Sequence, residues 1–252
     1  MKKILALVSA FLLLPAFLLF VNAQKKTMTL TSRSKEAINR TQIGILHLLN
    51  IENAQAYEEF RQALELDKNF TLPLVFMANL SIGEAQKTYA DLAIKSAEGK
   101  SAGEKLLATT VAPENIQGLN SETWKKLYAL FPDDDLAGYY YVTYRESRKE
   151  TFEAAKEYIS KFPGKAWMYN TIAYYYMNDL KDFEMAKENF TKYILLYPEG
   201  CNPYDSMGEY YLNVGDYENS EKYYNMALEK YPFNISSLDK LKEIKELKKK
   251  NR

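Results

Sequence analysis

The chain has 252 residues with 33 basic and 33 acidic side chains, so it carries no formal net charge and lacks the broad positive field that nucleic-acid binding requires. One Cys and one His exclude a disulfide framework and the usual Cys/His zinc sites. A hydrophobic content of 47% excludes a disordered chain, and 21 Tyr and 12 Phe with only 10 Gly and 8 Pro indicate helices packed by bulky side chains.

The first 23 residues have the pattern of a secretory signal peptide. Two lysines precede an apolar run over residues 4–21, and the small residue Ala23 ends the segment. An uncleaved membrane anchor is the alternative, because the run is just long enough to span a bilayer. Pro15 within the run favours cleavage. We therefore expect a bacterial exported protein, periplasmic or extracellular, that begins at Gln24 and keeps no membrane span.

Residues 24–34 follow the predicted cleavage site and show no apolar periodicity. Segments near a terminus without packing partners are commonly unstructured. The sequence therefore predicts a flexible lead-in here, ahead of a helical domain over residues 35–234.

An aromatic residue followed by Pro recurs along the second half of the chain, with prolines 31, 35 and 34 residues apart: Phe131-Pro132, Phe162-Pro163, Tyr197-Pro198 and Tyr231-Pro232. Pro cannot continue a helix, so each pair is expected to end one helix and begin the turn to the next. A period of this length is typical of helical repeats.

The clearest unit covers residues 201–234. Its first half predicts a helix with one packed face, its second half predicts another, and Gly215-Asp216 forms the turn between them. The unit resembles the tetratricopeptide repeat, whose small, aromatic and Pro positions are filled here by Gly208, Tyr211, Ser220, Tyr224, Ala227 and Pro232.

Other units match the same pattern less completely. The unit before Pro198 fits with one extra residue in its turn, through Tyr169, Ile172, Ala173, Tyr176, Phe183, Ala186 and Phe190. The first unit fits through Ile43, Gly44, His47, Ala56, Phe60 and Ala63, and the second through Leu74, Met77, Ala78, Ala90 and Ile94. Residues 95–163 are degenerate, and residues 235–252 predict an amphipathic capping helix with a basic tail.

The expected fold is an all-α, right-handed superhelical solenoid of about six antiparallel helix pairs. Isolated polar residues have structural explanations in it: His47 as a packed or groove histidine, Cys201 as a small buried residue, and Asp133–Asp135 as a solvated turn and helix cap rather than a cation site. No catalytic constellation is recognisable, so we expect no enzymatic activity, no cofactor and no metal.

The resemblance implies a protein-binding scaffold whose concave groove is lined by one face of each first helix. By register these residues are Val75, Asn79, Tyr139, Thr143, Trp167, Asn170, Tyr174, Met177, Asn202, Asp205 and Glu209, with Leu72, Ile82 and Leu212 beside them. Asp205 and Glu209 would repel an acidic C-terminal tail, so a partner segment with apolar and cationic groups is expected. Glycan or small-molecule capture by the aromatic groove and a role in envelope assembly are the alternatives, and the oligomeric state stays open.

Overall fold

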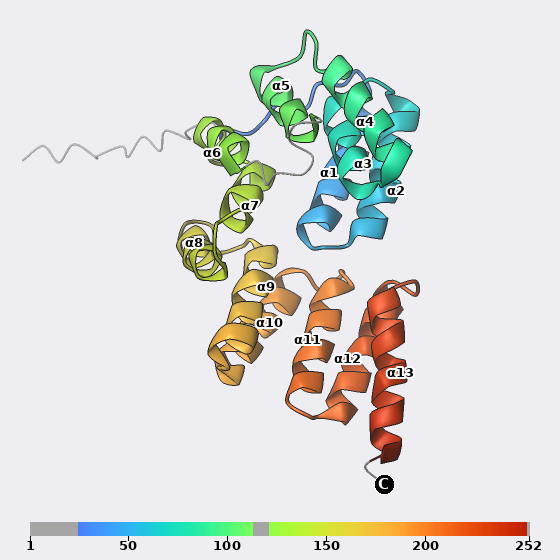
Figure 1. The fold of residues 1–252 in the computed structure, drawn as a ribbon, viewed down its shortest axis with the longest axis vertical. Coiled ribbons are helices and arrows are strands. Elements are labelled where there is room, and N and C mark those ends of the chain that lie inside the picture. The colour runs from blue at the N-terminus through green and yellow to red at the C-terminus, as the bar shows by residue number, and fades with distance from the viewer. Residues whose placement is uncertain (1–24, 113–120, 251–252) are drawn as a thin grey trace, which may run out of the picture.

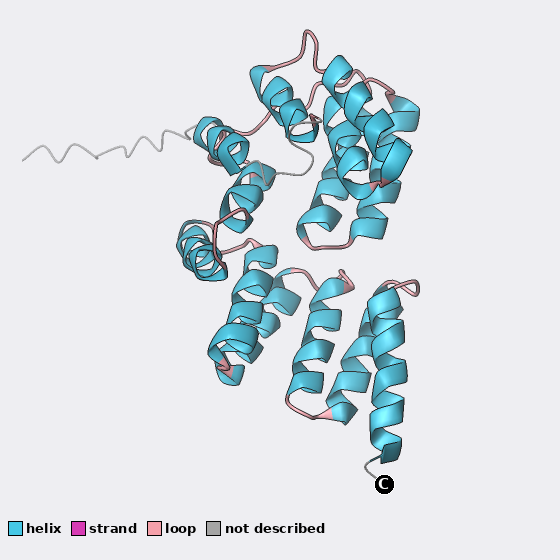
Figure 2. Cartoon of the chain, in the orientation of Figure 1, coloured by secondary structure: helices cyan, strands magenta, loops and turns pink. Residues whose placement is uncertain are grey.

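The computed structural model describes residues 25–112 and 121–250, so the predicted signal peptide lies outside the described residues. Within them the regular elements are all helical (Figure 2). No described helix has the length and apolar character needed to cross a bilayer. The elements are α1 (Lys35–Leu49), α2 (Asn53–Leu66), α3 (Thr71–Leu80), α4 (Gly83–Ser96), α5 (Ala102–Ala108), η1 (Thr109–Val111), α6 (Ser121–Leu130), α7 (Asp135–Thr143), α8 (Arg148–Lys161), α9 (Ala166–Tyr175), η2 (Tyr176–Leu180), α10 (Phe183–Leu196), α11 (Asn202–Asn213), α12 (Tyr217–Lys230) and α13 (Ile235–Lys250).

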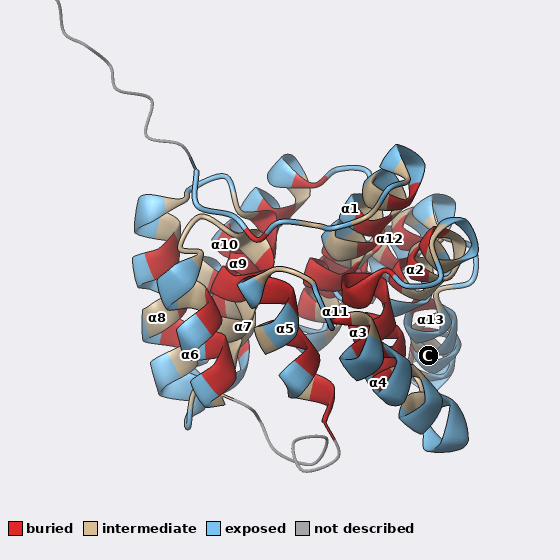
Figure 3. Ribbon diagram, turned by 90° about the horizontal axis from the view of Figure 1, so that it is seen from above, coloured by how far each residue is buried: buried red, intermediate tan, exposed pale blue. Residues whose placement is uncertain are grey.

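The helices pack as successive pairs that wind into a solenoid, with α1–α4 at one end and α9–α13 at the other (Figure 1). Between them, α5, η1 and α6 replace a regular pair, as the degenerate sequence of this region indicates. Buried residues lie along the faces that the helices turn toward one another, and exposed residues lie on the outside (Figure 3). The predicted all-α solenoid is confirmed.

Close approach of the two helices in a pair depends on glycine. A Cβ on Gly44 would lie 2.6 Å from Cε1 of Phe60, and one on Gly208 would lie 2.9 Å from Cδ1 of Tyr224. Both rings are almost fully buried. The first and last pairs therefore share one contact, between the small and aromatic positions predicted from the repeat pattern.

The extra residue in the turn before α10 is absorbed by a π-helix. The chain leaves α9 through η2 and turns at Lys181, whose φ is 57°. Single π-turns are a recurrent way to accommodate an inserted residue without breaking a helix. The repeat spacing thus changes while the packing of α9 against α10 is kept.

The lead-in corrects the sequence prediction. Residues 25–34, which we call the strap, lie across the domain in extended form. The N–H groups of Lys26 and Met28 donate to the carboxylates of Asp133 and Asp134 at 2.9 and 3.0 Å. Thr31 donates to Glu104 at 3.1 Å, and the Met28 side chain is buried. The acceptors lie 73 to 107 positions away in the sequence. The sequence of the strap itself therefore carries no sign of these contacts, and the prediction of a flexible segment is wrong.

The acidic turn at Asp133–Asp135 is not the fully solvated cap that the sequence predicts. Asp134 does cap α7, accepting a hydrogen bond from the N–H of Ala137 at 3.0 Å. It is only partly exposed, however, because it also receives the strap. The cap is confirmed and the solvated surroundings are corrected.

The predicted capping helix is present as α13, which packs on α12 and α11. Ile244 is buried, but Ile235 and Leu238 remain exposed, so only part of the expected apolar face is used. The start of α13 is held instead by polar contacts. Ser237 donates its N–H to Asn234 at 3.2 Å and its hydroxyl to the Asp205 carboxylate.

Gly44→Ala tests the helix-packing contact. The added methyl group has to displace the buried Phe60 ring, which should lower the free energy of unfolding by about 1–3 kcal/mol in urea denaturation. Gly164→Ala is the matched control, because a Cβ there meets nothing within 4 Å, and it should change stability by less than about 0.5 kcal/mol. Equal effects of the two substitutions would show that the first pair does not depend on this close approach.

Candidate functional site

The two ends of the solenoid meet at Glu52, in the turn between α1 and α2. Its side chain is 3% exposed. One carboxylate oxygen accepts the N–H groups of Cys201 and Asn202 at 2.7 and 3.2 Å, and the other accepts the Tyr197 hydroxyl at 2.8 Å. Figure 1 places this turn beside the N-terminal end of α11. We call this set of hydrogen bonds the closing contact.

The helix geometry explains why a carboxylate fits at this point. The first N–H groups of a helix have no partner within it, and the helix dipole makes that end positive. A buried anion is therefore stabilised at the start of α11, as phosphate and carboxylate groups are at other helix N-termini. Here the anion comes from the chain itself, 149 residues before Cys201.

The Glu52 carboxyl is ionised in the folded protein. Burial alone would raise its pKa, but the hydrogen bonds from His47, Tyr197 and the N–H of Asn202 outweigh burial, and its pKa lies below the ordinary 4.5. His47 Nδ1 lies 2.6 Å from a Glu52 oxygen. His47 is thus half-buried and partnered, consistent with a structural histidine.

Cys201 is the small buried residue that was predicted. Its thiol contacts the amide of Gln55 on α2, with an N–S distance of 3.5 Å. Burial, reinforced by the Glu52 charge, raises the pKa of the thiol to about 12. The thiol is therefore protonated at neutral pH. Cys201 takes part in the closing contact through its backbone N–H and not through its thiol.

An open groove of about 430 Å³ lies next to the closing contact, between the α7–α8 loop, the start of α8 and the inner face of α9. Ile51, from the α1–α2 turn, forms its opposite edge. We call it the inner groove. It brings together three of the predicted residues: Thr143, Asn170 and Tyr174.

Two buried polar atoms of residues that line the inner groove lack hydrogen-bond partners among the described residues. They are Asn170 Oδ1, in a residue only 3% exposed, and Arg145 Nε. Buried polar atoms are nearly always satisfied, so an acceptor and a donor left open at one groove are unusual. The Arg145 guanidinium also lies 4.0 Å from the centre of the Tyr141 ring, which fixes its position.

Apolar surface lines the same groove. Ile51 is 52% exposed, although its turn is otherwise buried. Phe152 and Tyr175 stack at 4.3 Å between ring centres and form part of the lining. The inner groove therefore combines apolar contacts with two residues, Asn170 and Arg145, that each have a buried polar atom without a partner among the described residues. Arg145 also lines a second hollow, between α6 and α8. The sequence reasoning missed Ile51 and Arg145, because both lie in turns where no repeat position applies.

Several of the other predicted groove residues are inside the protein, which corrects their assignment. Val75, Trp167, Met177 and Asp205 are all buried, as is Leu72. Val75 and Trp167 belong to the larger apolar core, Met177 packs among α9, α10 and α11, and Asp205 lies against α13. Asn79 and Ile82 are exposed at the end of α3 and beyond it, away from the inner groove.

The remaining candidates are engaged within the chain. Tyr139 packs edge-on against Tyr140 at 5.1 Å, and burial raises its pKa to about 12. Asn202 belongs to the closing contact and also donates through its side chain to the Tyr193 hydroxyl at 3.1 Å. Leu212 is half-buried on α11 and does not line the inner groove.

The acidic residues expected to face a partner have internal partners instead. Asp205 accepts from Ser236 and Ser237 of α13, and Glu209 accepts the Tyr174 hydroxyl at 2.7 Å. Burial, followed by the charge of Glu209, raises the pKa of Tyr174 well above its ordinary value. Asp205 is therefore buried and Glu209 is paired with Tyr174, so neither carboxylate stands free on a groove as the sequence predicts.

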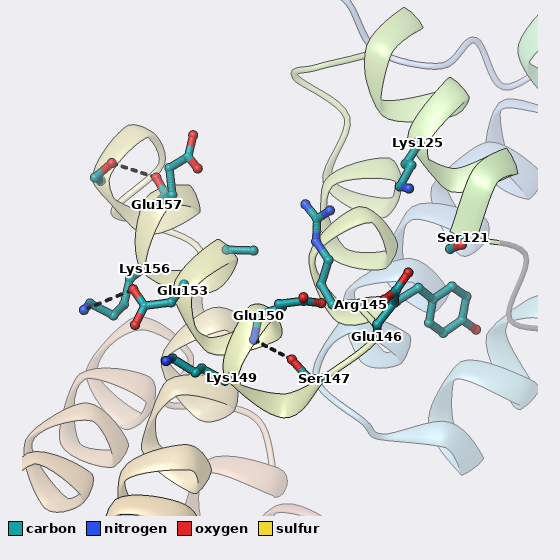
Figure 4. A pocket seen from close by; sticks show the side chains of 13 residues that line it. Ser121, Lys125, Arg145, Glu146, Ser147, Lys149, Glu150, Glu153, Lys156 and Glu157 are labelled. Atoms are coloured by element: carbon teal, nitrogen blue, oxygen red, sulfur yellow. Dashed lines mark hydrogen bonds and ion pairs between the residues drawn. The ribbon is translucent and has the colours of Figure 1, made fainter.

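A second hollow, of about 1070 Å³, lies between α6 and α8 (Figure 4). Arg145 extends into it opposite Lys125, and glutamates of α8 line the other side. Charges of both signs alternate here, for example in the Glu153–Lys156 pair at 3.6 Å. Such a surface selects no particular ligand charge. Within the described ranges, no group of His, Cys, Asp and Glu is arranged to hold a metal ion.

Acidification should weaken the closing contact. Because the folded-state pKa of Glu52 lies below 4.5, its contribution to stability is present above about pH 4.5 and is lost as pH falls through the folded value. Glu52→Gln should cost about 2–3 kcal/mol at pH 7 and clearly less at about pH 3, as measured by urea denaturation.

Glu199→Gln, at an exposed carboxyl of the neighbouring loop, is the control and should leave stability nearly unchanged at both pH values. A Glu52→Gln deficit of the same size at both pH values would contradict an ionised Glu52 in the folded state.

The comparisons with known proteins agree with this architecture. The tetratricopeptide repeat family model matches residues 168–199 and 203–233, which lie in α9–α10 and α11–α12. Among solved structures, the APC/C hetero-tetramer Cut9–Hcn1 aligns with a TM-score of 0.50 and 17% identity, over 83% of this chain and 42% of that chain. This chain therefore spans about two fifths of that protein.

Two further structures are similar at a lower score. PilW, a widely conserved type IV pilus biogenesis factor, aligns with a TM-score of 0.47 and 13% identity over 82% of this chain and 99% of that one. A thermophilic TPR protein of Thermus thermophilus gives a TM-score of 0.39 and 14% identity over 82% and 98%. No curated protein sequence matches the chain significantly. The chain therefore contains two segments that match the tetratricopeptide repeat, residues 168–199 and 203–233, within a solenoid of helix pairs.

Proposed function

We propose that the protein is a non-catalytic scaffold that binds an extended segment of a partner protein in the inner groove. The observation that carries this proposal is the pair of unpartnered atoms at the groove, Asn170 Oδ1 and Arg145 Nε. A peptide backbone presents one N–H donor and one C=O acceptor per residue, so a segment laid along the groove would pair with these two side chains once they turn toward it. A buried polar atom without a hydrogen bond costs free energy, and a bound segment that supplies the hydrogen bond recovers that cost.

The apolar contacts of the inner groove define the rest of the expected segment. Ile51 is half-exposed, and the Phe152–Tyr175 stack lies across from it. Grooves of a few hundred Å³ take a short stretch of ligand rather than a folded domain. We therefore expect a segment of a few residues that places one aliphatic or aromatic side chain between these walls and is read mainly through its backbone.

Asn170→Ala separates binding from folding. A library of random peptides displayed on phage supplies binders of the full chain, and calorimetry gives their Kd values. Asn170→Ala should weaken binding about tenfold, which corresponds to about 1.4 kcal/mol. It should leave the thermal melt nearly unchanged, because Oδ1 has no partner in the folded chain.

Asn225→Ala is the matched control. That side-chain amide donates to the Glu221 carbonyl of its own helix, at 2.9 Å, and is exposed. It should alter neither the melt nor the Kd. Unchanged affinity in Asn170→Ala, or a library that yields no peptide while a sugar binds, would reject peptide binding in this groove.

The proposal also includes export, which rests on the sequence of the first 23 residues. A charged start, an apolar run and Ala23 together favour secretion and cleavage. The intact mass of the protein recovered from its native host should correspond to a chain that begins at Gln24. A mass that includes residues 1–23 would support the anchor alternative instead.

A further inference from the structure

We propose that Glu52 is the positioning residue that completes the inner groove, by holding the α1–α2 turn in place so that Ile51 forms its edge. This inference rests on the proposed function of the groove. Glu52 contacts no partner segment itself. It acts through the residue before it, whose exposed apolar side chain lines the groove.

The turn consists of a strained, exposed residue between two buried polar anchors. Ile51 has a φ of 62°, a left-handed conformation that a β-branched residue rarely adopts. Asn50 before it is fully buried, and Glu52 after it is 3% exposed. Such a conformation persists only where the surroundings determine it, and it is found preferentially at functional positions.

Both anchors are held by the C-terminal repeats. The Asn50 carbonyl oxygen accepts the Tyr193 hydroxyl at 3.4 Å, and Tyr193 in turn receives the side chain of Asn202. Glu52 makes the closing contact with Tyr197 and the start of α11. The turn is therefore held from two sides. The N–H groups of Ile51 and Glu52 donate to carbonyls of α1, and helices 143 to 149 positions later in the chain hold the two anchors.

The geometry couples the closing contact to the groove. The inner face of α9, with Asn170 and Tyr174, forms one wall, and Ile51 lies across from it. If the Glu52 contact is removed, the strained turn can relax and Ile51 leaves the groove. The open acceptor at Asn170 is then unaffected, but the apolar edge is lost. A segment bound in the groove would then lose the apolar contact with Ile51, and more of its own surface would be exposed to water.

The experiment compares the full chain with Glu52→Ala and with Glu59→Ala. Glu59 is a control on α2, because its ion pair with Arg40 at 3.2 Å stays within the first pair. Hydrogen exchange measures the N–H groups of Cys201 and Asn202, which donate to Glu52. Kd values are measured for peptides selected from the random library on the unmodified chain.

We expect exchange at Cys201 and Asn202 to rise at least tenfold in Glu52→Ala and to stay unchanged in Glu59→Ala. The peptides should bind Glu52→Ala about tenfold more weakly. Asn170→Ala should weaken the peptides without altering exchange at Cys201, which separates the groove from the closing contact. Glu52→Gln and Tyr197→Phe, which keep side-chain shape, replace Glu52→Ala if that variant fails to fold.

The outcomes are distinct. Faster exchange with unchanged peptide affinity overturns the positioning role and leaves the proposed function in place. Unchanged exchange in a folded Glu52→Ala protein overturns it as well, because Glu52 then does not hold the turn. If no library peptide binds the unmodified chain, the proposed function fails, and the positioning role fails with it even where exchange rises.

Discussion

A buried carboxylate joins the first and last parts of this solenoid. Moving a carboxylate out of water costs several kcal/mol, which is recovered only when hydrogen bonds surround it. Glu52 meets that condition through one tyrosine hydroxyl, one histidine and two backbone N–H groups at a helix start. Solenoids usually depend on contacts between neighbouring repeats. Here a contact between repeats that are far apart in the sequence is added to them.

The closure determines which inner surface stays accessible. Residues such as Val75, Trp167 and Met177 hold the positions that line a groove in an open superhelix, yet they are buried here. Val75 and Trp167 belong to the larger apolar core, and Met177 packs between the neighbouring helices α9, α10 and α11. What remains open is the small inner groove beside the closing contact, where turn residues contribute as much as the helices do. The site is therefore a product of closure and not of the repeat alone.

The sequence predicted what depends on local periodicity. Gly208 and Tyr224, Gly44 and Phe60, and the extra residue before α10 were all identified from spacing. The strap, the Asp205 contact with α13 and Glu52 were not. Their partners lie 31 to 150 positions away, and the longest of these separations depend on how far the solenoid turns. Neither repeat pattern nor composition encodes that rotation, so the buried positions of Asn170 and Asp205 could not be foreseen.

The strap and the α1–α2 turn share a property that matters during synthesis. The strap's acceptors Asp133 and Asp134 are synthesised 106 to 107 residues after the strap residues that donate to them. Cys201, at the start of α11, is synthesised 149 residues after Glu52. Contacts of such long range slow folding, because loop closure comes before any gain. The strap therefore stays unattached until the middle of the chain has been made, and Glu52 gains its long-range partners only when α11 emerges. Nascent chains of intermediate length therefore lack contacts that the finished fold has, and the last of these forms only after the chain has passed Asn202.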